Sequence, residues 1–375
     1  MKPQPIFKPV LEKRSIGTSD FKKRNSFLMK ICYINLTKEI PSRDAVYLRG
    51  LKENGAEVVE IMNSSPGLIK FWRIFKQHRV IRKKYDVAMV GYTAHILVPF
   101  VRLISNKKIV FNALGSLYEG KIISRAQASP RSFKALYWWL IDFLAFHAAS
   151  LSLVESNAQK EFLQNKFWLS ERKLLRAWTG ADDNIFFHDA AIPKLPIFTV
   201  LFRGRFLPEA GIEYAIETAK TLKNENIKFR IIGSGPTEIK IKELLGKYNL
   251  ENVEWIKEKL SPADLRNKML ECHLSLGQLS AHDRLNRTIP HKAFESLAIK
   301  MPYLTARNKA ILEVLKENET CFCCNPADAE DLANKIIFLS ENPEAGKKLA
   351  DKAFEKVLSC TWEKRAENIV KFVKL

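Results

Sequence analysis

The strongest constraint on the fold is an alternation of short β-rich runs with helix-length segments, which occurs twice along the 375 residues. In the first half, the runs KICYINL, EVVEI, DVAMVG, KKIVFNA and LSLVES are separated by segments such as 44–54, 68–84, 94–104 and 131–148. The second half contains FTVLFRG, KFRIIGS, NVEWI, HLSLGQL, YLTA and CFCC. Such alternation predicts parallel sheets with helices on both faces. We therefore expect an α/β protein with two doubly wound, Rossmann-like domains facing a cleft.

The domain boundary is predicted at the stretch AAIPKLPIF, where two prolines interrupt the alternation. A chain of this length exceeds the usual size of one core, so two domains are expected, residues 28–192 and 193–358. Residues 1–27 mix basic residues with Pro and Ser, and are expected to be either a disordered basic extension or an over-extended gene start. Residues 359–375 are expected to form a helix that packs back on the N-terminal domain.

Composition limits the partners and the compartment. The net charge of +20 implies an anionic partner, which composition alone leaves open between nucleic acid, anionic lipid and a polyphosphate-bearing ligand. The sequence contains no apolar run of about 18 residues and no secretory signal in its first 27 residues. Six cysteines in a chain of this length favour a reducing compartment. A cytoplasmic protein, peripheral on the inner face of the cell membrane, is expected.

One segment combines basic and aromatic residues. LIKFWRIFKQHRVIRKKYD, residues 68–86, carries seven Lys or Arg side chains with Phe71, Trp72, Ile74 and Phe75 between them. A basic helix with aromatic anchors suits an anionic membrane surface, whereas the alternative is a core-packing helix with a solvated outer face. Nucleic acid is not expected as a partner, because no helix-turn-helix, RRM or zinc pattern accompanies the charge. FKALYWWLIDFLAF, residues 133–146, is expected to be a core helix.

Two strand-to-helix turns in the second half suit a phosphate-bearing ligand. In open α/β sheets, ligands bind beyond the carboxyl ends of the strands. RGRFLPEAG, residues 203–211, places Arg203 and Arg205 beside Gly204, where a guanidinium can fork onto phosphate oxygens. GSGP, residues 233–236, ends a strand and opens a helix, as a phosphate-facing loop would.

A third motif, IPHKAFESLAIKMP at residues 289–302, combines charged and apolar positions at a helix start. Thr288 as the N-cap and Pro290 near the first turn predict a helix that places Lys292 and Glu295 on one face. The pair is either a solvated surface contact or part of an anion site at the helix N-terminus.

In this order, the motifs resemble those of retaining glycosyltransferases of family 4, which have the two-domain GT-B fold. The likeness runs from about residue 29 to 372. MKICYINL and RGLKENGAEVVEI resemble the first strand, helix and second strand of that family, and SLVESNAQKEFL with TGADDNIF resembles the end of its first domain. FRGRFLPEAG resembles its "G-R-x-x-x-x-K-G" turn, RIIGSGP its "G-x-G-P" turn, and IPHKAFESLAIKMP its donor-binding helix.

The resemblance implies roles for specific residues. Glu295 would hold the ribose hydroxyls of a nucleotide sugar, while Lys292, Arg205 and the helix start would face its diphosphate. The predicted catalytic residues are Arg205, Lys292 and Glu295. The remaining predicted donor-site residues are Gly204, Gly233, Gly235, Pro236, Trp255, Arg287 and His291. The predicted acceptor side is His95, Asn112, Ser116 and Tyr118. His95 is either a cleft residue or a structural loop histidine.

Several positions depart from the family pattern. The lysine of the "R-x-x-x-x-K" turn falls on Ala210, and the first Glu of the usual E-x7-E pair falls on Arg287. Arg284, Arg287 or Asp283 of the loop AHDRLNRT would substitute for the missing carboxylate. The family glycine near the helix end is Lys300, at a C-cap position where a non-Gly residue carries strain. The histidine that many members place after a first-domain strand falls on Asn112.

The resulting expectation is a retaining, metal-independent glycosyltransferase without a cofactor. It would move a sugar from a nucleotide diphosphate to a glycan, polyprenyl or glycolipid acceptor in cell-envelope polysaccharide or glycolipid synthesis. GSLYEGKI, residues 115–122, is close to a P-loop, but Ile122 stands where Mg²⁺ binding requires Ser or Thr. C-x-x-C at Cys321 and Cys324 lacks a second pair with zinc-site spacing, so no metal site is expected. The alternatives are a non-catalytic GT-B subunit that binds a partner, or a nucleotide-sugar epimerase.

Overall fold

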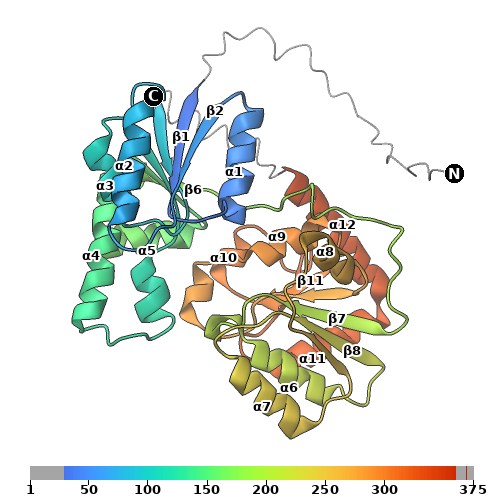
Figure 1. Cartoon of the computed structure of the whole chain (residues 1–375). Helices are drawn as coiled ribbons and strands as arrows, with labels where there is room; N and C mark the ends of the chain where they lie inside the picture. The colour runs from blue at the N-terminus through green and yellow to red at the C-terminus, as the bar shows by residue number, and fades with distance from the viewer. Residues whose placement is uncertain (1–28, 360–368, 370–375) are drawn as a thin grey trace, which may run out of the picture.

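Two parallel six-stranded sheets, one in each half of the chain, organise the structure (Figure 1). The computed structural model describes residues 29–359 and residue 369. The strand order is β2-β1-β3-β4-β5-β6 in the N-terminal sheet and β12-β11-β10-β7-β8-β9 in the C-terminal sheet. The prediction of two doubly wound domains is therefore confirmed.

The N-terminal domain contains six strands and five α-helices in the described residues. Its strands are β1 (Lys30–Asn35), β2 (Glu57–Met62), β3 (Val87–Val90), β4 (Lys108–Leu114), β5 (Leu151–Val154) and β6 (Leu174–Arg176). Its helices are α1 (Ser42–Glu53), α2 (Ile69–Ile81), α3 (Leu97–Ile104), α4 (Phe133–Ala148) and α5 (Asn157–Phe167), with a π-helical turn over Glu119–Ile123. The short strand β6 was not predicted.

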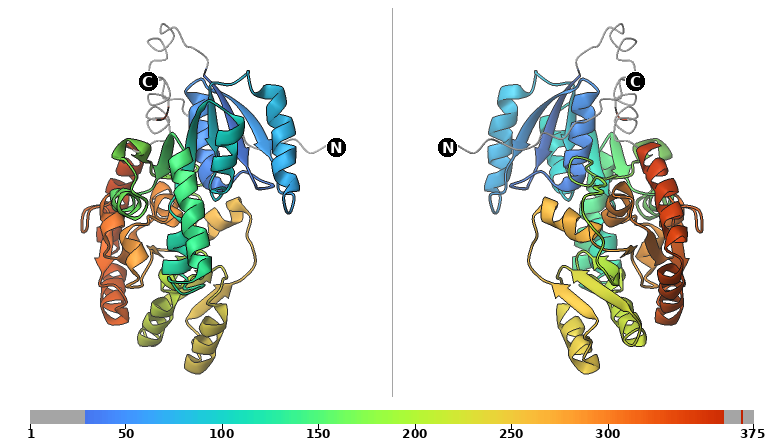
Figure 2. Two further views of the ribbon diagram at one scale, coloured as in Figure 1. Left: turned by 90° about the vertical axis from the view of Figure 1, so that its left-hand side faces the viewer. Right: turned by 90° about the vertical axis from the view of Figure 1, so that its right-hand side faces the viewer.

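The C-terminal domain repeats this arrangement. Its strands are β7 (Phe198–Arg203), β8 (Ile227–Ile232), β9 (Val253–Ile256), β10 (Leu274–Leu276), β11 (Tyr303–Ala306) and β12 (Phe322–Cys324). Its helices are α6 (Ile212–Thr221), α7 (Glu238–Tyr248), α8 (Pro262–Leu270), α9 (His291–Ala298), α10 (Lys309–Leu312), α11 (Ala329–Glu341) and α12 (Pro343–Ser359), with 3₁₀ turns over Pro208–Ala210 and Asp283–Asn286. The side views in Figure 2 show the N-terminal domain above the C-terminal domain.

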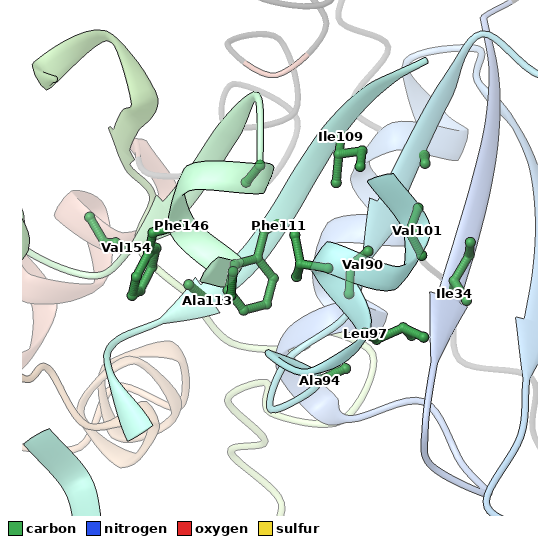
Figure 3. Close-up of a cluster of buried hydrophobic side chains, with 14 of the residues drawn as sticks. Ile34, Val90, Ala94, Leu97, Val101, Ile109, Phe111, Ala113, Phe146 and Val154 are labelled. Atoms are coloured by element: carbon green, nitrogen blue, oxygen red, sulfur yellow. The ribbon is translucent and has the colours of Figure 1, made fainter. Parts of the chain in front are cut away.

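The N-terminal sheet is covered on both faces by apolar clusters, as its strand composition predicts. On one face, Val90 and Phe111 pack against Leu97 and Val101 of α3 and Phe146 of α4 (Figure 3). The opposite face packs against α1, and its cluster also contains the distant residue Ile369. Ile369 is the one described residue of the predicted C-terminal helix beyond Ser359, because residues 360–368 and 370–375 lie outside the described part. The predicted extension 1–27 lies outside it as well.

Helix α4 differs from the prediction of a core helix. Its buried residues include Ala135, Ala145 and Phe146, but a stripe of its apolar side chains lies at the surface. The exposed fractions in this stripe are Phe133 92%, Leu136 57%, Tyr137 51%, Leu140 45% and Leu144 45%. The spacing i, i+3, i+4, i+7 and i+11 places all five on one side of the helix. No helix in the described residues is long and apolar enough to cross a membrane.

Candidate active site between the domains

The start of α9 lies at the centre of the predicted site. Pro290, and not the predicted Thr288, is its N-cap, and no side chain caps the first turn. Lys292 is buried, and its Nζ donates to the carbonyl oxygen of Gly277 at 2.6 Å and lies 4.2 Å from the centre of the Phe202 ring. Burial, together with the charge of Arg203, holds the pKa of Lys292 well below its usual value. Lys292 therefore ties α9 to the strand end at Gly277.

Glu295 is held by a residue from another strand. The Nη2 atom of Arg203, the last residue of β7, donates to Oε2 of Glu295. The sequence motif suggested that Arg203 would bind phosphate, but the structure pairs it with this carboxylate. Arg205, two residues further along, is exposed at the turn together with Gly204. The second guanidinium is therefore the one that faces outward, as the resemblance implied for a diphosphate contact.

The two glycine turns pack against each other through their backbones. Gly233 has a φ of 136°, and a Cβ atom there would lie 2.1 Å from the carbonyl oxygen of Gly204. A Cβ atom on Gly235 would lie 2.6 Å from the backbone nitrogen of Phe206. The indole Nε1 of Trp255 donates to the carbonyl oxygen of Gly233 at 2.9 Å. These contacts require glycine at both positions and bring the predicted loop residues together beside β7 and β8, with Pro236 exposed.

His291 begins α9 in an environment that keeps its imidazole neutral. The pKa of His291 is lowered to about 4, mainly by burial; the charge of Glu295 opposes this, and the positive charges of Arg43 and Arg203 act in the same direction as burial. At pH 7 the ring is therefore uncharged. A neutral imidazole beside Glu295 can offer one hydrogen-bond donor and one acceptor to a ligand.

Arg287 joins the two domains. Its Nε donates to Oε1 of Glu119 at 2.6 Å, and its Nη2 donates to Oδ2 of Asp283 at 2.7 Å. Glu119 lies in the π-helical turn of the N-terminal domain and also accepts a hydrogen bond from Gln159 at 3.0 Å. Position 287, which carries a carboxylate in the resembled family, thus carries a guanidinium here, and Glu119 of the other domain neutralises its charge.

A pocket of about 370 Å³ lies beside this contact, at the carboxyl ends of β3 and β4. His95 and Ser116 line it, as predicted for the acceptor side. Both face Asp142, since the Ser116 hydroxyl donates to its Oδ2 at 2.6 Å and His95 Nε2 lies 3.7 Å from its Oδ1. Burial raises the pKa of Asp142 above its ordinary value, while its hydrogen bonds oppose the rise. The carboxyl group therefore anchors the two predicted residues.

The other two predicted acceptor residues are not among those that line this pocket. Asn112 is fully buried and hydrogen bonds to Arg43 and Asp44. Tyr118 is 7% exposed and packs within the N-terminal core. Both can position the pocket walls, because Asn112 lies in β4 two residues before the strand end, and Tyr118 follows the lining residue Leu117.

Three charged residues near the pocket were not in the predicted set. Arg284 Nη1 donates to Oε1 of Glu209 at 3.3 Å, and Arg125 Nη2 lies 3.7 Å from the same oxygen. Arg284 and Glu209 lie in the two 3₁₀ turns of the C-terminal domain, and Arg125 lies in a loop of the N-terminal domain. Arg284 was named only as a substitute for the missing carboxylate, and no local sequence signal links it to Glu209 or Arg125, because the domain arrangement brings them together.

Asp182 and Asp183 end the first-domain pattern in the sequence and form ion pairs in the structure. Arg49 Nη1 lies 2.9 Å from Oδ1 of each of them. Within residues 29–359, no group of three His, Cys, Asp or Glu side chains has a geometry that could hold a metal ion.

Comparison with known proteins agrees with this architecture. Residues 188–356 match the family model described as glycosyl transferases group 1. The chain is 26% identical to an uncharacterized glycosyltransferase of Methanocaldococcus jannaschii over 164 residues. This match covers 44% of this chain and 44% of that relative. It is 24% identical over 160 residues to WcaL of Escherichia coli K12, a putative colanic acid biosynthesis glycosyltransferase, covering 40% of this chain and 37% of WcaL. The match thus spans less than half the length of these relatives.

The likeness to solved structures covers nearly the whole chain. HepE of Anabaena, in complex with UDP, superposes with a TM-score of 0.70 at 15% identity, over 92% of this chain and 100% of HepE. At this identity the likeness shows the fold alone. The resemblance drawn from the motifs is thereby confirmed for the group, while family 4 itself stays a prediction. Residues 188–356 match the family model of the glycosyl transferases group 1, and the chain as a whole has the two-domain GT-B fold.

Proposed function

We propose that this protein is a retaining, metal-independent glycosyltransferase that moves a sugar from a nucleotide diphosphate sugar to a glycan or lipid-linked acceptor. The observation that carries the proposal is the Arg203–Glu295 pair, which fixes the carboxylate between the β7 turn and the start of α9. Two glycine turns in backbone contact lie next to it. A carboxylate can accept hydrogen bonds from ribose hydroxyls, and open backbone turns can approach a diphosphate closely.

The donor class is supported by the fold relatives. HepE was solved with UDP and with UDP-glucose. The substrate class is also supported by WcaL, whose name assigns it to colanic acid biosynthesis. We therefore place the acceptor in cell-envelope polysaccharide or glycolipid synthesis.

The proposed reaction needs positive charge at the leaving diphosphate. When the anomeric C–O bond breaks, negative charge develops on the nucleotide diphosphate, and fixed cations and backbone dipoles stabilise it. The exposed guanidinium of Arg205 and the first turn of α9 are the groups suited to this role. Lys292 supports the turn from behind through Gly277. No metal ion or other cofactor enters the proposed mechanism.

A membrane-facing role for residues 68–86 completes the proposal. In α2, Trp72 is 56% exposed and Phe75 is 42% exposed, whereas Ile74 is buried and Phe71 packs against the ring of Phe100 at 5.0 Å. Two of the four named apolar anchors thus remain available to a lipid surface. We place the protein in the cytoplasm, peripheral on an anionic membrane.

The decisive experiment combines donor binding with turnover in a chelator. Purified protein is screened by thermal shift against UDP-, GDP- and dTDP-sugars, and release of the nucleotide diphosphate is then followed in EDTA. We expect one donor class to raise the melting temperature and activity to persist in EDTA. Loss of turnover in EDTA that Mg²⁺ or Mn²⁺ restores would refute the metal-free mechanism. Donor binding without release of nucleotide would instead favour a non-catalytic subunit, for which the Arg287–Glu119 pair is the motivating observation.

A further inference from the structure

The pocket beside His95 is positively charged. Lys121, Arg125 and Arg284 line it, and Glu209 is the carboxylate that contacts the two guanidinium groups. Asp142, which contacts the lining residues Ser116 and His95, is the second carboxyl group beside the pocket, so three positive charges exceed two carboxyl groups by one. Lys121 Nζ lies 4.4 Å from the centre of the Trp138 ring, and among the described residues it forms no ion pair. The pocket thus presents more cationic charge than its own walls neutralise.

Buried nitrogen atoms of the same pocket residues lack partners. Within the described part of the chain, Trp138 Nε1, Arg125 Nε and His95 Nδ1 are buried without a hydrogen bond. A buried N–H without a partner is unfavourable, so a ligand that accepts these hydrogen bonds gains affinity. His95 Nε2 faces the carbonyl oxygen of Gly115 at 3.1 Å and therefore carries the hydrogen, which leaves Nδ1 of the neutral ring to accept one. The pocket offers two donors for oxygen atoms and one acceptor for a hydroxyl.

The sequence around the pocket carries the same charge imbalance. Residues 61–141 contain 14 Lys or Arg and two acidic residues, Asp86 and Glu119. Asp86 accepts a hydrogen bond from the backbone of Lys30, and Glu119 is engaged by Arg287 and Gln159. Neither carboxylate is among the residues that line the pocket. This segment therefore contributes a net charge of +12, from 14 basic and two acidic residues, to the net +20 of the chain.

We propose that this pocket binds the phosphoryl group of the acceptor substrate, with a sugar hydroxyl of the same molecule at His95. A phosphate monoester carries a charge of about −1.5 to −2 near neutral pH, which is opposite in sign to the charge of the pocket, and its oxygens can accept hydrogen bonds from Arg125 and Trp138. The inference rests on the proposed transferase function. It goes beyond that function because it assigns the acceptor a charged group and a site separate from the Arg203–Glu295 region.

The test measures phosphate binding without turnover. Inorganic phosphate is titrated calorimetrically into the full-length protein, with and without saturating UDP. We expect binding in both conditions, with dissociation constants that agree within about twofold. Arg125→Gln and Trp138→Phe should each weaken phosphate binding, Arg125→Gln at least tenfold, while the affinity for UDP stays unchanged. Arg131→Gln, a matched change at an exposed arginine outside the pocket, should leave both affinities unchanged. Circular dichroism checks that each variant is folded.

Two further ligands distinguish the source of the phosphoryl group. Glucose 1-phosphate represents a soluble sugar phosphate, and n-octyl phosphate represents a lipid phosphate with an apolar tail. Displacement of bound phosphate by either one supports the proposal, and the tighter competitor indicates the acceptor type. The proposal is overturned if UDP blocks phosphate, since the pocket then belongs to the donor, or if Arg131→Gln weakens binding as much as Arg125→Gln. Failure of every nucleotide to bind, with phosphate binding intact, would instead refute the donor assignment and leave the phosphate site standing.

Discussion

Lys292 and Glu295 share the first turns of one short helix, yet their surroundings give them different roles. Lys292 is turned inward to a backbone carbonyl at 2.6 Å, and burial lowers its pKa. Glu295 remains partly exposed and is fixed by the guanidinium of Arg203. We therefore expect Glu295 to contact the donor, and Lys292 to act through the position of α9.

Replacing Glu295 with alanine should affect both binding and stability. We expect the affinity for the nucleotide donor to fall at least tenfold, because one or two charge-assisted contacts of about 1.5–3 kcal/mol each are lost. The free energy of unfolding should also fall by about 1–3 kcal/mol, because the buried Arg203 loses its partner. Donor titration and urea unfolding measure these effects, with Glu243→Ala on the exposed side of α7 as the control. Unchanged donor affinity in Glu295→Ala would contradict its assignment.

The glycine turns predict a contrast between two Gly-to-Ala changes. Gly233→Ala should destabilise the protein by about 1–3 kcal/mol and impair donor binding, because its φ of 136° disfavours a side chain and the new Cβ would collide with Gly204. Gly246→Ala lies within α7, where a Cβ meets no atom within 4 Å, and should stabilise by about 0.5–1 kcal/mol. Urea unfolding of both variants is the measurement. Equal stability of the two variants would show that the turn contact is not required.

At the level of elements, α2, α3 and α4 form one side of the N-terminal domain (Figure 1). Helix α3 packs against α4, and Phe71 of α2 packs against Phe100 of α3. The basic side chains lie mainly on α2, whereas the exposed apolar stripe lies on α4. A membrane-binding face made of these helices would therefore use the basic side chains of α2 and the exposed apolar side chains of α2 and α4.

Liposome flotation can separate the two contributions. Each Lys or Arg near an anionic surface adds about 1 kcal/mol, and the apolar side chains add burial. We expect wild type to float with anionic but not with zwitterionic vesicles and to detach as salt increases. Arg79, Arg82 and Lys83 changed to Glu, or Trp72 and Phe75 changed to Ser, should each abolish flotation.

The choice of side chains for the apolar variant follows from the structure. Phe71→Ser would damage the core and give an ambiguous result, so the exposed Trp72 and Phe75 are used. A separate variant with Leu136 and Leu140 changed to Ser tests α4. If wild type ignores anionic vesicles, or binds RNA more tightly than lipid at equal salt, the membrane assignment is wrong.

Across the whole molecule, specific polar contacts fix the two domains relative to each other. The Glu313 carboxylate accepts hydrogen bonds from the backbone nitrogens of Asn157 and Ala158 at the start of α5. Glu155 is 4% exposed and accepts from the backbone nitrogen of Ile289 at 3.1 Å. These contacts join strand ends and helix starts of one domain to those of the other, so the interdomain pocket depends on them.

Glu155 should make stability depend on pH. The pKa of Glu155 is raised to about 8, mainly by burial and to a lesser degree by the negative charge of Glu119. The charges of Arg43 and Arg284 and the backbone hydrogen bond from Ile289 lower this pKa, but they do not cancel the effect of burial. The folded protein thus holds a proton that the unfolded chain releases near pH 4.5, so the stabilisation is complete below that pH and is lost progressively toward pH 8.

Urea unfolding between pH 5 and 8.5 measures this dependence. Glu155→Gln should flatten the decline and should be more stable than wild type at pH 8, because no charge is then buried. Glu161→Gln, an exposed change on α5, should keep the wild-type slope. A wild-type slope in Glu155→Gln would assign the dependence to other buried carboxyl groups such as Asp44 and Asp142.

The sequence by itself determined the two parallel sheets and the glycine turns at their edges. These features depend on short stretches of sequence. The strand and helix periods are visible over a few neighbouring residues, and the backbone freedom of glycine belongs to a single residue. It did not predict β6, which has three residues, or the N-cap at Pro290. It also failed to orient α4, because that segment is apolar on nearly all sides and offers no polar face to mark the surface.

Only the tertiary structure decided which partner each charged residue has. Arg287 meets Glu119 across 168 positions of sequence, and Arg203 meets Glu295 across 92. Arg125, Arg284 and Glu209 converge from loops of both domains. The strength of such contacts depends on distance and burial, which arise when the domains pack and leave no periodic signal in the chain.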